Sequence, residues 1–506
     1  MLFTSILSTA VSALLLVPMS LVQAAPTQSG KGYLSVIRVE ESVSLAYSTT
    51  DPHAKNWVGL YSASGGGPVN EVYVAPAKAW SYATAGQGNV RIDIRSLTSG
   101  KYIAFFLARD GYKWLADPVY FNIPAAVTPF AFAAPDVTLH NARVGDAYTA
   151  KIGGLLSGSS SGAVTYTKVA GPPWVQVGAD GSLQGTPGSS QADKLEKVVI
   201  SATSGDDKAN LSVYVPVRKA RSKLVTELRV VTFNLWVGGT HISNYHNKQI
   251  QFIVDTNADV IGLQEANRDH VKRLADALGW YFWSDDRELG IISRYPIVED
   301  YGYVNLSGGV RIALDGEASQ INFWNAHFTA YPYGPYDACF ERKTVAKIIQ
   351  REAESGRTKQ VTDTINAMKD QIKAARTVPV ILVGDTNAPS HLDWTEATRS
   401  RNCGYAAVQW PTSWIPTQAG LIDSFRVAHP DPVAVPGTTW SPIYPFNQGS
   451  TGKVEPQDRI DVIYHSGDLT VVDSEVLVVG KPKTFGSHQN NEWTSDHAAV
   501  IAVYKL

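Results

Sequence analysis

The stretch Val378-Pro379-Val380-Ile381-Leu382-Val383-Gly384-Asp385-Thr386-Asn387 joins an apolar run to a polar pair. The run predicts a buried strand that breaks at Gly384, with the residues after it on a loop. A carboxylate and a carboxamide at the mouth of a buried strand, here Asp385 and Asn387, are costly unless they have a task. Alone, the motif is equally compatible with an ordinary Gly-Asp turn.

The second half of the chain repeats this arrangement of an apolar run with polar residues at its end. Taken alone, each further motif has an ordinary explanation: Asn234 can cap a turn, Glu265 can cap a helix and His327 can be a core histidine. Together they predict one polar site. The motifs are Thr232-Phe233-Asn234, Leu263-Gln264-Glu265, Asn325-Ala326-His327, Arg459-Ile460-Asp461 and Ser495-Asp496-His497.

The order Asn, Gln-Glu, His, Gly-Asp-x-Asn, Arg-Ile-Asp, Ser-Asp-His resembles the endonuclease/exonuclease/phosphatase superfamily. That superfamily includes deoxyribonucleases, abasic-site endonucleases, neutral sphingomyelinases and inositol polyphosphate 5-phosphatases. The similarity runs from about Leu228 to Leu506. It implies a catalytic domain over residues 224–506, folded as a four-layer α/β sandwich with its site at one end.

The resemblance and the residue types together imply a divalent cation. A phosphoester repels an incoming nucleophile, so a cation has to offset the charge of its oxygens. The implied ligands are Asn234, Glu265 and Asp496, whose oxygens suit Mg²⁺, with Mn²⁺ as an acceptable substitute.

The remaining roles follow from the resemblance. It implies that Asp385 positions or deprotonates the attacking water and that Asn387 orients the attack and holds a phosphate oxygen. His327 and His497 would donate hydrogen bonds to the phosphoryl oxygens. Asp461 would pair with His497 and fix its tautomer. Either Asp385 or His497 could be the general base.

Two further features concern the rim of the predicted site and the partner of His497. Tyr331, Tyr333 and Tyr336 lie on a turn-rich loop after His327 and are expected to rim the site. They could stack a base or a sugar, rest against lipid, or simply pack on neighbouring prolines. Asp458, as in the deoxyribonuclease form of the motif, is the reserve partner of His497.

The first half of the chain predicts strands alone. Asn56-Trp57-Val58-Gly59-Leu60-Tyr61 makes residues 26–126 resemble a SKICH-like β-sandwich. Gly171-Pro172-Pro173-Trp174 and the turns after it make residues 127–219 resemble an immunoglobulin/cadherin-like β-sandwich. The fold class predicted is therefore two all-β sandwiches followed by a four-layer α/β sandwich. The two sandwiches would bind a surface, polymer or protein partner, or act as spacers.

In the second half, strands alternate with helices. The helix at 268–278 shows the clearest period, with apolar residues at i, i+3, i+4 and i+7. The other expected elements are strands at 228–235, 260–264 and 321–326, a helix at 248–257, a largely helical region at 337–376 interrupted near 355–356, and strands beginning at 378, 460, 469 and 498.

The composition of the chain indicates which partners and which cellular compartment are expected. The chain has 506 residues and a net charge of −2, which gives no overall attraction to nucleic acid or anionic membrane. Residues 1–25 are apolar, contain several serines and end in small residues, which predicts a signal peptide and secretion; the alternative is a membrane anchor. No later segment is apolar enough to cross a membrane. Cys339 and Cys403, the only cysteines, suggest one disulfide.

Three functions remain open on the sequence. The first is a secreted phosphodiesterase or phosphatase acting on a small or lipid-borne phosphoester. The second is a secreted endonuclease, which the near-neutral charge disfavours because nucleic-acid binding needs basic residues along the phosphates. The third is a non-catalytic adhesion protein in which the last domain serves as a scaffold. The complete set of acidic residues and histidines argues against it.

Overall fold

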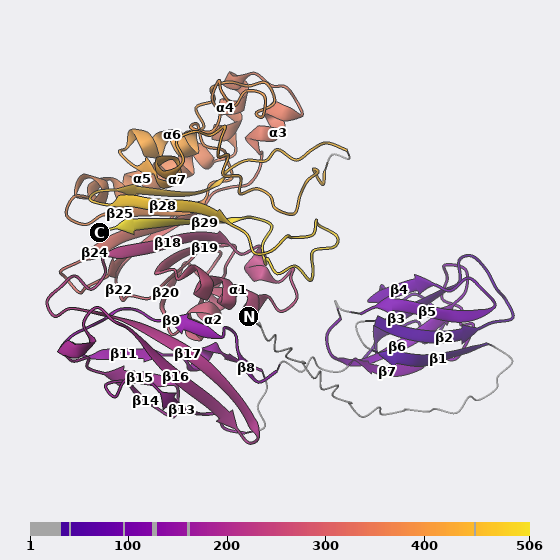
Figure 1. The fold of residues 1–506 in the computed structure, drawn as a ribbon. Helices are drawn as coiled ribbons and strands as arrows, with labels where there is room; N and C mark the ends of the chain where they lie inside the picture. Colours follow the sequence, from indigo (N-terminus) through magenta and orange to yellow (C-terminus); the bar gives the residue numbers. More distant parts are fainter. Residues whose placement is uncertain (1–31, 40–41, 95–96, 124–128, 159–161, 450–451) are drawn as a thin grey trace, which may run out of the picture. The chain divides into compact units, whose positions relative to one another are not determined.

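The computed structural model describes residues 32–39, 42–94, 97–123, 129–158, 162–449 and 452–506 (Figure 1). The chain divides into two compact units, Met1–Val127 and Thr128–Leu506. The expected signal peptide, residues 1–25, lies outside the described residues. No helix within the described ranges combines the length and the apolar character needed to span a bilayer.

The first unit is all β, with two antiparallel sheets. The first sheet has the order β1-β2-β5 and the second β4-β3-β6-β7. Alternate side chains of both sheets fill the core between them, among them Leu45, Leu60 and Phe106. The strands are β1 (Tyr33–Val39), β2 (Ser42–Ser48), β3 (Trp57–Ser62), β4 (Ala79–Tyr82), β5 (Gln87–Asp93), β6 (Gly100–Leu107) and β7 (Val119–Ile123).

The second unit begins with a further β-rich module. Its long hairpin pairs β16 (Leu195–Ser204) with β17 (Asp207–Arg218). The shorter elements are β8 (Ala131–Phe132), β9 (Asp136–Thr138), β10 (Ala142–Arg143), β11 (Tyr148–Lys151), η1 (Gly153–Leu155), β12 (Leu156–Ser157), β13 (Thr165–Ala170), β14 (Gln176–Val177), β15 (Ser182–Gly185) and η2 (Ser189–Gln191). An N-terminal β region followed by an α/β domain is therefore confirmed.

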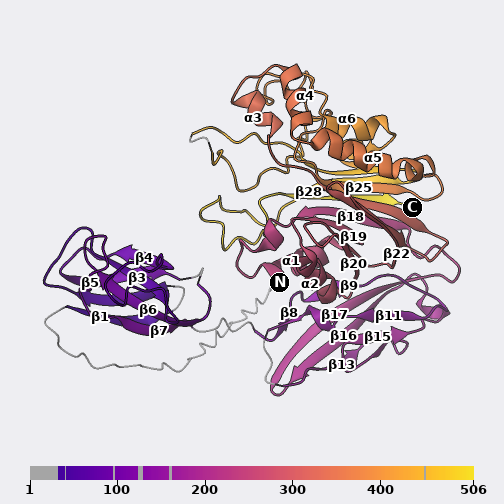
Figure 2. The ribbon, with the colours of Figure 1, turned by 180° about the vertical axis from the view of Figure 1, so that it is seen from behind.

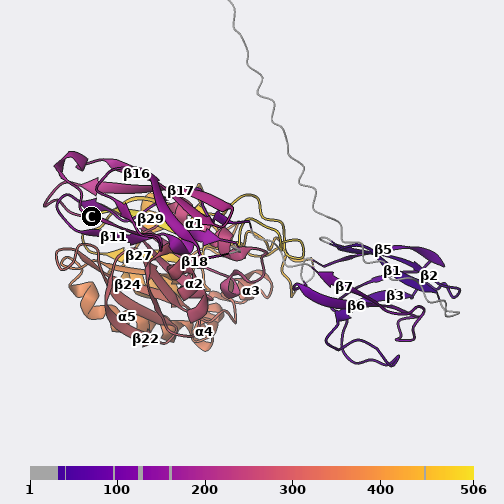
Figure 3. The same cartoon turned by 90° about the horizontal axis from the view of Figure 1, so that it is seen from below.

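This β-rich module is fused to the α/β domain by one shared core. Ile152 and Leu155 belong to the same buried cluster as Leu274 of the α/β domain. At Gly154 the two parts approach so closely that an added Cβ would lie 2.4 Å from the carbonyl oxygen of Asp276. Strand β9 of the module contacts α1, and η1 contacts α2; the module is seen beneath these helices in Figure 1 and from below in Figure 3. The module is therefore a rigid part of the second unit and is not a loosely tethered spacer.

Two six-stranded sheets form the centre of the α/β domain. Their orders are β20-β21-β19-β18-β29-β28 and β22-β23-β24-β25-β27-β26. Apolar side chains between them include Val230, Phe323 and Val383. The first sheet contains β18 (Glu227–Asn234), β19 (Val260–Gln264), β20 (Tyr281–Ser284), β21 (Gly290–Ser293), β28 (Thr470–Leu477) and β29 (Ala499–Lys505). The second contains β22 (Ile297–Val304), β23 (Ser307–Ala313), β24 (Gln320–His327), β25 (Val380–Asp385), β26 (Ile422–Asp423) and β27 (Asp461–Ser466).

Helices cover the outer faces of both sheets. Helices α1 (Tyr245–Thr256) and α2 (Arg268–Leu278) pack on the first sheet. Helices α5 (Arg357–Lys373) and α6 (Pro411–Gln418) cover the second, as the rear view shows (Figure 2). The order of layers is thus helix, sheet, sheet, helix. Shorter helices are η3 (Val237–Gly239), α3 (Gly334–Cys339), α4 (Val345–Glu354) and α7 (Ser424–Ala428). A disulfide joins Cys339 and Cys403.

One predicted boundary is wrong in a way that matters for the site. Strand β25 does not break at Gly384 but continues through it to Asp385. Gly384 has a φ of 154°, and a Cβ there would lie 2.1 Å from the carbonyl oxygen of Ala326 on β24. Only glycine allows the two parallel strands to lie this close. Asp385 is therefore held within the sheet and not on a loop.

Candidate functional site

Strand register brings the distant motifs to one end of the two sheets. His327 pairs with Asp385 across β24 and β25, and Asp385 pairs with Asp461 across β25 and β27. In the other sheet, Asn234 at the end of β18 pairs with Gln264 at the end of β19, directly before Glu265. Side chains that are far apart in the sequence therefore lie side by side because they end neighbouring strands.

Asp385 stands at the centre of the site and is fully buried. The Nε2 atoms of His327 and His497 each lie 3.6 Å from its Oδ2 atom. Asn234 Nδ2 donates to the same oxygen at 3.0 Å, and the backbone N–H of Asn387 donates to Oδ1 at 2.9 Å. The two histidines thus face one carboxylate, in agreement with the single polar site that the sequence motifs predict.

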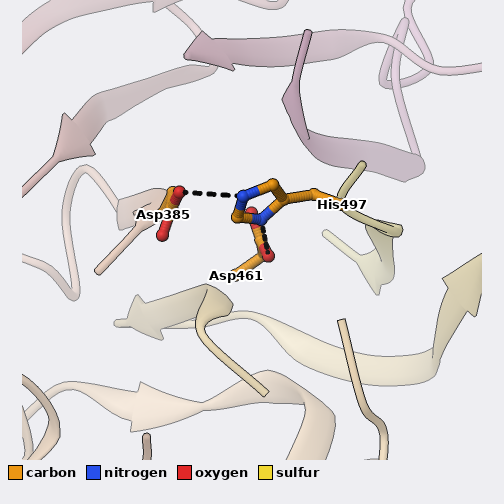
Figure 4. Close-up of side chains that lie close together, drawn as sticks. All are labelled: Asp385, Asp461 and His497. Carbon is orange, nitrogen blue, oxygen red and sulfur yellow. Dashed lines mark hydrogen bonds and ion pairs between the residues drawn. The ribbon is translucent and has the colours of Figure 1, made fainter. Parts of the chain in front are cut away.

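His497 is fixed from behind by Asp461. Its Nδ1 atom lies 2.9 Å from Asp461 Oδ2, which leaves Nε2 directed at Asp385 (Figure 4). Burial lowers the pKa of His497, but the charges of Asp461 and Asp385 outweigh burial and raise that pKa well above its usual value. The contact expected between Asp461 and His497 is present, and it sets which ring nitrogen faces the site.

Glu288 performs the corresponding task for His327, and it was not among the residues predicted from the sequence. His327 Nδ1 lies 3.2 Å from Glu288 Oε2. Burial lowers the pKa of His327, but hydrogen bonding to Glu288 and the charge of Asp385 raise it overall. The hydrogen bond to His327 in turn lowers the pKa of Glu288. Glu288 lies in a polar segment without a strand-end pattern, so no sequence signal distinguished it from a surface carboxylate.

Glu265 and Asp496 add further negative charge to the same site. Glu265 has a φ of 52° and accepts hydrogen bonds from Asn234 Nδ2 at 3.3 Å and from the backbone N–H of Val237 at 2.8 Å. Asp496 is buried, and its Oδ1 atom has no hydrogen-bond partner among the described residues. Burial, followed by the charges of Glu265 and Asp385, raises the pKa of Asp496 to about 7 although His497 acts against the shift.

These groups fit a divalent cation. A buried carboxylate oxygen without a partner, close to other carboxylates, is costly until a cation offsets the charge. Glu265 and Asp496 supply the hard oxygen donors that Mg²⁺ prefers. The amide oxygen of Asn234 accepts from the backbone N–H of Trp236 at 2.9 Å, and its nitrogen bridges Glu265 and Asp385. Asn234 therefore links the two carboxylates by hydrogen bonds, in addition to any role it has as a ligand of the cation.

A second set of donor atoms overlaps with the first. One oxygen each of Asp385 and Asp461 and one ring nitrogen of His497 lie within 4.8 Å of one another. In this structure His497 Nδ1 is already bonded to Asp461, and Asp385 carries hydrogen bonds on both oxygens. Asp461 Oδ1, like Asp496 Oδ1, has no hydrogen-bond partner among the described residues. The set around Glu265 and Asp496 is the better match to Mg²⁺, because its donor atoms are all oxygens.

Asn387 and Asp458 both form hydrogen bonds with the fold around the site. Asn387 Nδ2 donates to the carbonyl oxygen of Phe328 at 2.9 Å, so its amide already has a structural partner. Asp458 accepts hydrogen bonds from Trp394 Nε1 at 2.9 Å and from the hydroxyl of Tyr333 at 3.2 Å. Asp458 is therefore wrong as the reserve partner of His497, a place that Asp461 takes.

The three rim tyrosines divide. Tyr331 is 68% exposed, and its pKa is raised by partial desolvation and by the charges of Glu455 and Asp496, which indicates a position near the site. Tyr333 is 6% exposed, so its assignment to the rim is wrong. It is a buried residue at the N-cap of α3. Tyr336 is half-buried and donates to Glu455 at 2.6 Å.

A chain of aromatic rings leads away from His497. The ring of Trp440 lies 4.9 Å from that of His497, and Tyr444 follows at 5.4 Å from Trp440. Phe485 lies 5.2 Å beyond Tyr444 and 6.3 Å from Trp236. The position of Trp440 against His497 depends on loops that meet in space, so no local sequence pattern marks it.

Comparison with known proteins agrees with the geometry. Residues 231–497 match the endonuclease/exonuclease/phosphatase family. A Caenorhabditis elegans protein described as uncharacterized is 34% identical over 292 residues, which cover 55% of this chain and 91% of that protein. Among solved structures, truncated TDP2 of C. elegans is 15% identical, with a TM-score of 0.36, covering 55% of this chain and 98% of that one. An endonuclease/exonuclease/phosphatase of Beutenbergia cavernae is 17% identical, with a TM-score of 0.35, covering 56% and 72%. Both structural likenesses are remote.

Proposed function

The chain belongs to the endonuclease/exonuclease/phosphatase family and is a phosphoester hydrolase, and on this basis we propose a secreted, divalent-metal-dependent enzyme that acts on a small or lipid-borne phosphoester. One observation carries the proposal. Two imidazoles, each backed by its own carboxylate, point at one oxygen of Asp385. This arrangement provides donors for a phosphoryl group beside an acceptor for a proton.

Glu265 and Asp496 would hold the cation, with Asn234 between Glu265 and Asp385. Mg²⁺ suits these oxygen donors, and Mn²⁺ is an acceptable substitute. When bound, such an ion offsets the charge of the phosphoryl oxygens and lowers the pKa of water. The support from the structure is the unpartnered oxygen of Asp496 in a site rich in carboxylates.

The chain's own residues then divide the remaining work. Asp461 keeps a proton on Nδ1 of His497, so that Nε2 faces the substrate, and Glu288 orients His327 in the same way. Both Nε2 atoms would donate to phosphoryl oxygens. Asp385, held by the side chain of Asn234 and flanked by these two donors, accepts the proton of the attacking water. Asp385 is therefore our choice for the general base, with His497 as a donor.

The substrate is expected to be small or presented by a lipid. The described site contains five carboxylates and two histidines, a balance that repels a polyanion unless basic residues follow its backbone. The aromatic chain beginning at Trp440 favours an endonuclease as the second candidate, because bases stack on such rings. Family membership and the intact site favour an enzyme over a non-catalytic adhesion protein.

Secretion is proposed on two grounds. The apolar residues 1–25 have the composition of a signal peptide, and the Cys339–Cys403 disulfide suits an oxidising compartment. Detection of the chain in culture medium, cleaved near residue 25, is the expected result. Retention of the chain with cell membranes would favour the anchor interpretation instead.

The test of activity is a substrate panel with and without chelator. Bis(p-nitrophenyl) phosphate, sphingomyelin, phosphoinositides, sugar phosphates and plasmid DNA are compared for wild type, Glu265→Gln and His497→Ala. Glu299→Gln, which changes an exposed carboxylate on β22 paired with Arg311, is the matched control. We expect hydrolysis that stops with chelator, returns with Mg²⁺ and is lost only in the first two variants. Undiminished turnover in either of them would contradict the site assignment, and salt-sensitive cleavage of DNA would promote the endonuclease.

A further inference from the structure

The outer face of the sheet β4-β3-β6-β7 in the first unit carries a continuous row of aromatic rings. The centroids of Tyr73, Tyr112, Trp57, Trp80 and Tyr82 follow one another at 5.6, 6.1, 6.2 and 5.1 Å. We refer to these five residues as the aromatic row. Tyr73, Trp80 and Tyr82 are 58%, 53% and 47% exposed, whereas Trp57 is buried. Large exposed rings gathered on one face mark a binding surface more often than single ones do.

The row is held in place by the strands beneath it. Antiparallel register sets Trp57 opposite Tyr82 and Gly59 opposite Trp80. A Cβ on Gly59 would lie 2.6 Å from the ring of Trp57, so the missing side chain makes room for that ring. Trp57 Nε1 also donates to the carbonyl oxygen of Gly111 at 3.1 Å. Rings fixed in this way lose little side-chain entropy on binding.

Exposed ion pairs flank the Tyr82 end of the row. Arg109 contacts Asp51 at 2.8 Å, Lys55 contacts Asp110 at 2.8 Å, and the hydroxyl of Tyr82 donates to Asp110 at 3.2 Å. The charges cancel in pairs, so this fringe matches an uncharged ligand. It presents donors and acceptors together, as hydroxyl groups require. A proline-rich peptide, which also docks on aromatic rings, offers mainly carbonyl acceptors and would use the donors of this fringe but not its acceptors.

The neighbouring loop argues against insertion into a lipid layer. Val69, Val72 and Val74 are each more than half exposed, but Glu71 stands among them. Its carboxylate accepts from the backbone N–H of Trp114 at 3.0 Å. Moving a carboxylate into hydrocarbon is costly. The surface therefore suits a ligand that combines flat apolar faces with many hydroxyl groups and carries no charge.

We propose that the aromatic row binds a neutral polysaccharide. The C–H faces of successive sugar rings would lie on Tyr73, Trp80 and Tyr82, and sugar hydroxyls would reach the ion pairs beside Tyr82. This gives the first unit a binding function of its own, which does not depend on the substrate of the catalytic domain. It would keep the hydrolase on a polysaccharide-rich surface.

The full chain is tested for retention by cellulose and chitin particles and by affinity electrophoresis in gels containing xylan or a soluble β-glucan. We expect binding to at least one of these, weakened about tenfold by Trp80→Ala and by Tyr82→Ala, since a stacked ring contributes on that scale. Tyr33→Ala, which removes a similarly exposed ring from β1 in the other sheet, is the matched control and should bind normally. All variants should hydrolyse soluble bis(p-nitrophenyl) phosphate at the wild-type rate, so a failure of this proposal is separate from a failure of the catalytic one.

Three results would overturn the proposal. The first is no retention of the folded chain by any of the four polysaccharides. The second is equal binding by wild type and by both ring variants. The third is Trp80-dependent binding to phosphatidylcholine vesicles or to a polyproline peptide with none to polysaccharide. Because Trp80 and Tyr82 are both about half exposed, each variant is expected to fold, and circular dichroism checks this.

Discussion

Replacing Asp461 by asparagine tests the arrangement behind His497 most directly. Asp461 is fully buried, and its Oδ2 atom lies 2.9 Å from His497 Nδ1. The substitution Asp461→Asn would keep the volume but remove the negative charge that raises the pKa of His497, so Nε2 would donate from a neutral ring and bind a phosphoryl oxygen less strongly. A hydrogen bond between charged groups contributes about 2 kcal/mol, so kcat/KM should fall roughly 30-fold. Most of the loss should appear in kcat, because the donor acts on charge that develops during reaction.

The assay is steady-state hydrolysis of bis(p-nitrophenyl) phosphate with saturating Mg²⁺, together with thermal unfolding to show that the variant is folded. Asp458→Asn is the matched control, since Asp458 is a buried carboxylate three positions earlier that bonds to Trp394 and Tyr333. It should leave kcat/KM near the wild-type value. If Asp461→Asn also retained wild-type kcat/KM, the carboxylate would not orient His497, and the proposed division of work between the two histidines would be wrong.

Three further predictions concern stability and the rim. Burial raises the pKa of Asp458 to about 6, so the folded state keeps a proton that the unfolded chain loses above about pH 4. The free energy of unfolding should therefore fall as the pH rises from about 4 to about 6. In urea unfolding, Asp458→Asn should be more stable than wild type at pH 8, by about 3 kcal/mol at most, but not at pH 3. Gly154→Val should lower the melting temperature of the full chain, because its Cβ would lie 2.4 Å from the carbonyl oxygen of Asp276; unchanged unfolding would show that the β-rich module does not depend on this contact. Tyr331→Ala should raise KM several-fold without changing kcat or the melting temperature, since Tyr331 is 68% exposed beside Asp496; an unchanged KM would remove it from the rim.

Local sequence pattern predicted two elements to the residue. The helix expected at 268–278 is α2, because Asn267 accepts from the backbone N–H of His270 at its start and Gly279 ends it with a φ of 69°. The strand expected at 260–264 is β19. The helix α1 begins three residues earlier than expected, at Tyr245, where no side chain caps it. Boundaries were thus predicted well where a cap or a turn residue marks them.

The sequence alone was less informative where contacts between distant segments decide the outcome. Gly384 is a turn signal by itself, but its close approach to Ala326 keeps it within β25. Tyr333 looked like a rim residue, yet its hydroxyl reaches the buried Asp458. Glu288 lies in a polar segment, and only the path of the chain after β20 brings it to His327. Each of these results depends on a partner more than 30 positions away.

The amino-acid sequence by itself therefore determined the fold class of the second half and the residue types of its site, because strand ends rich in carboxylates, amides and histidines are a local pattern. The tertiary structure decided how they combine: both imidazoles at one oxygen of Asp385, and Asp496 left with an unpartnered oxygen. It also decided that the second β-rich module shares a core with the α/β domain. The physical reason is that register and packing join residues that no local pattern connects.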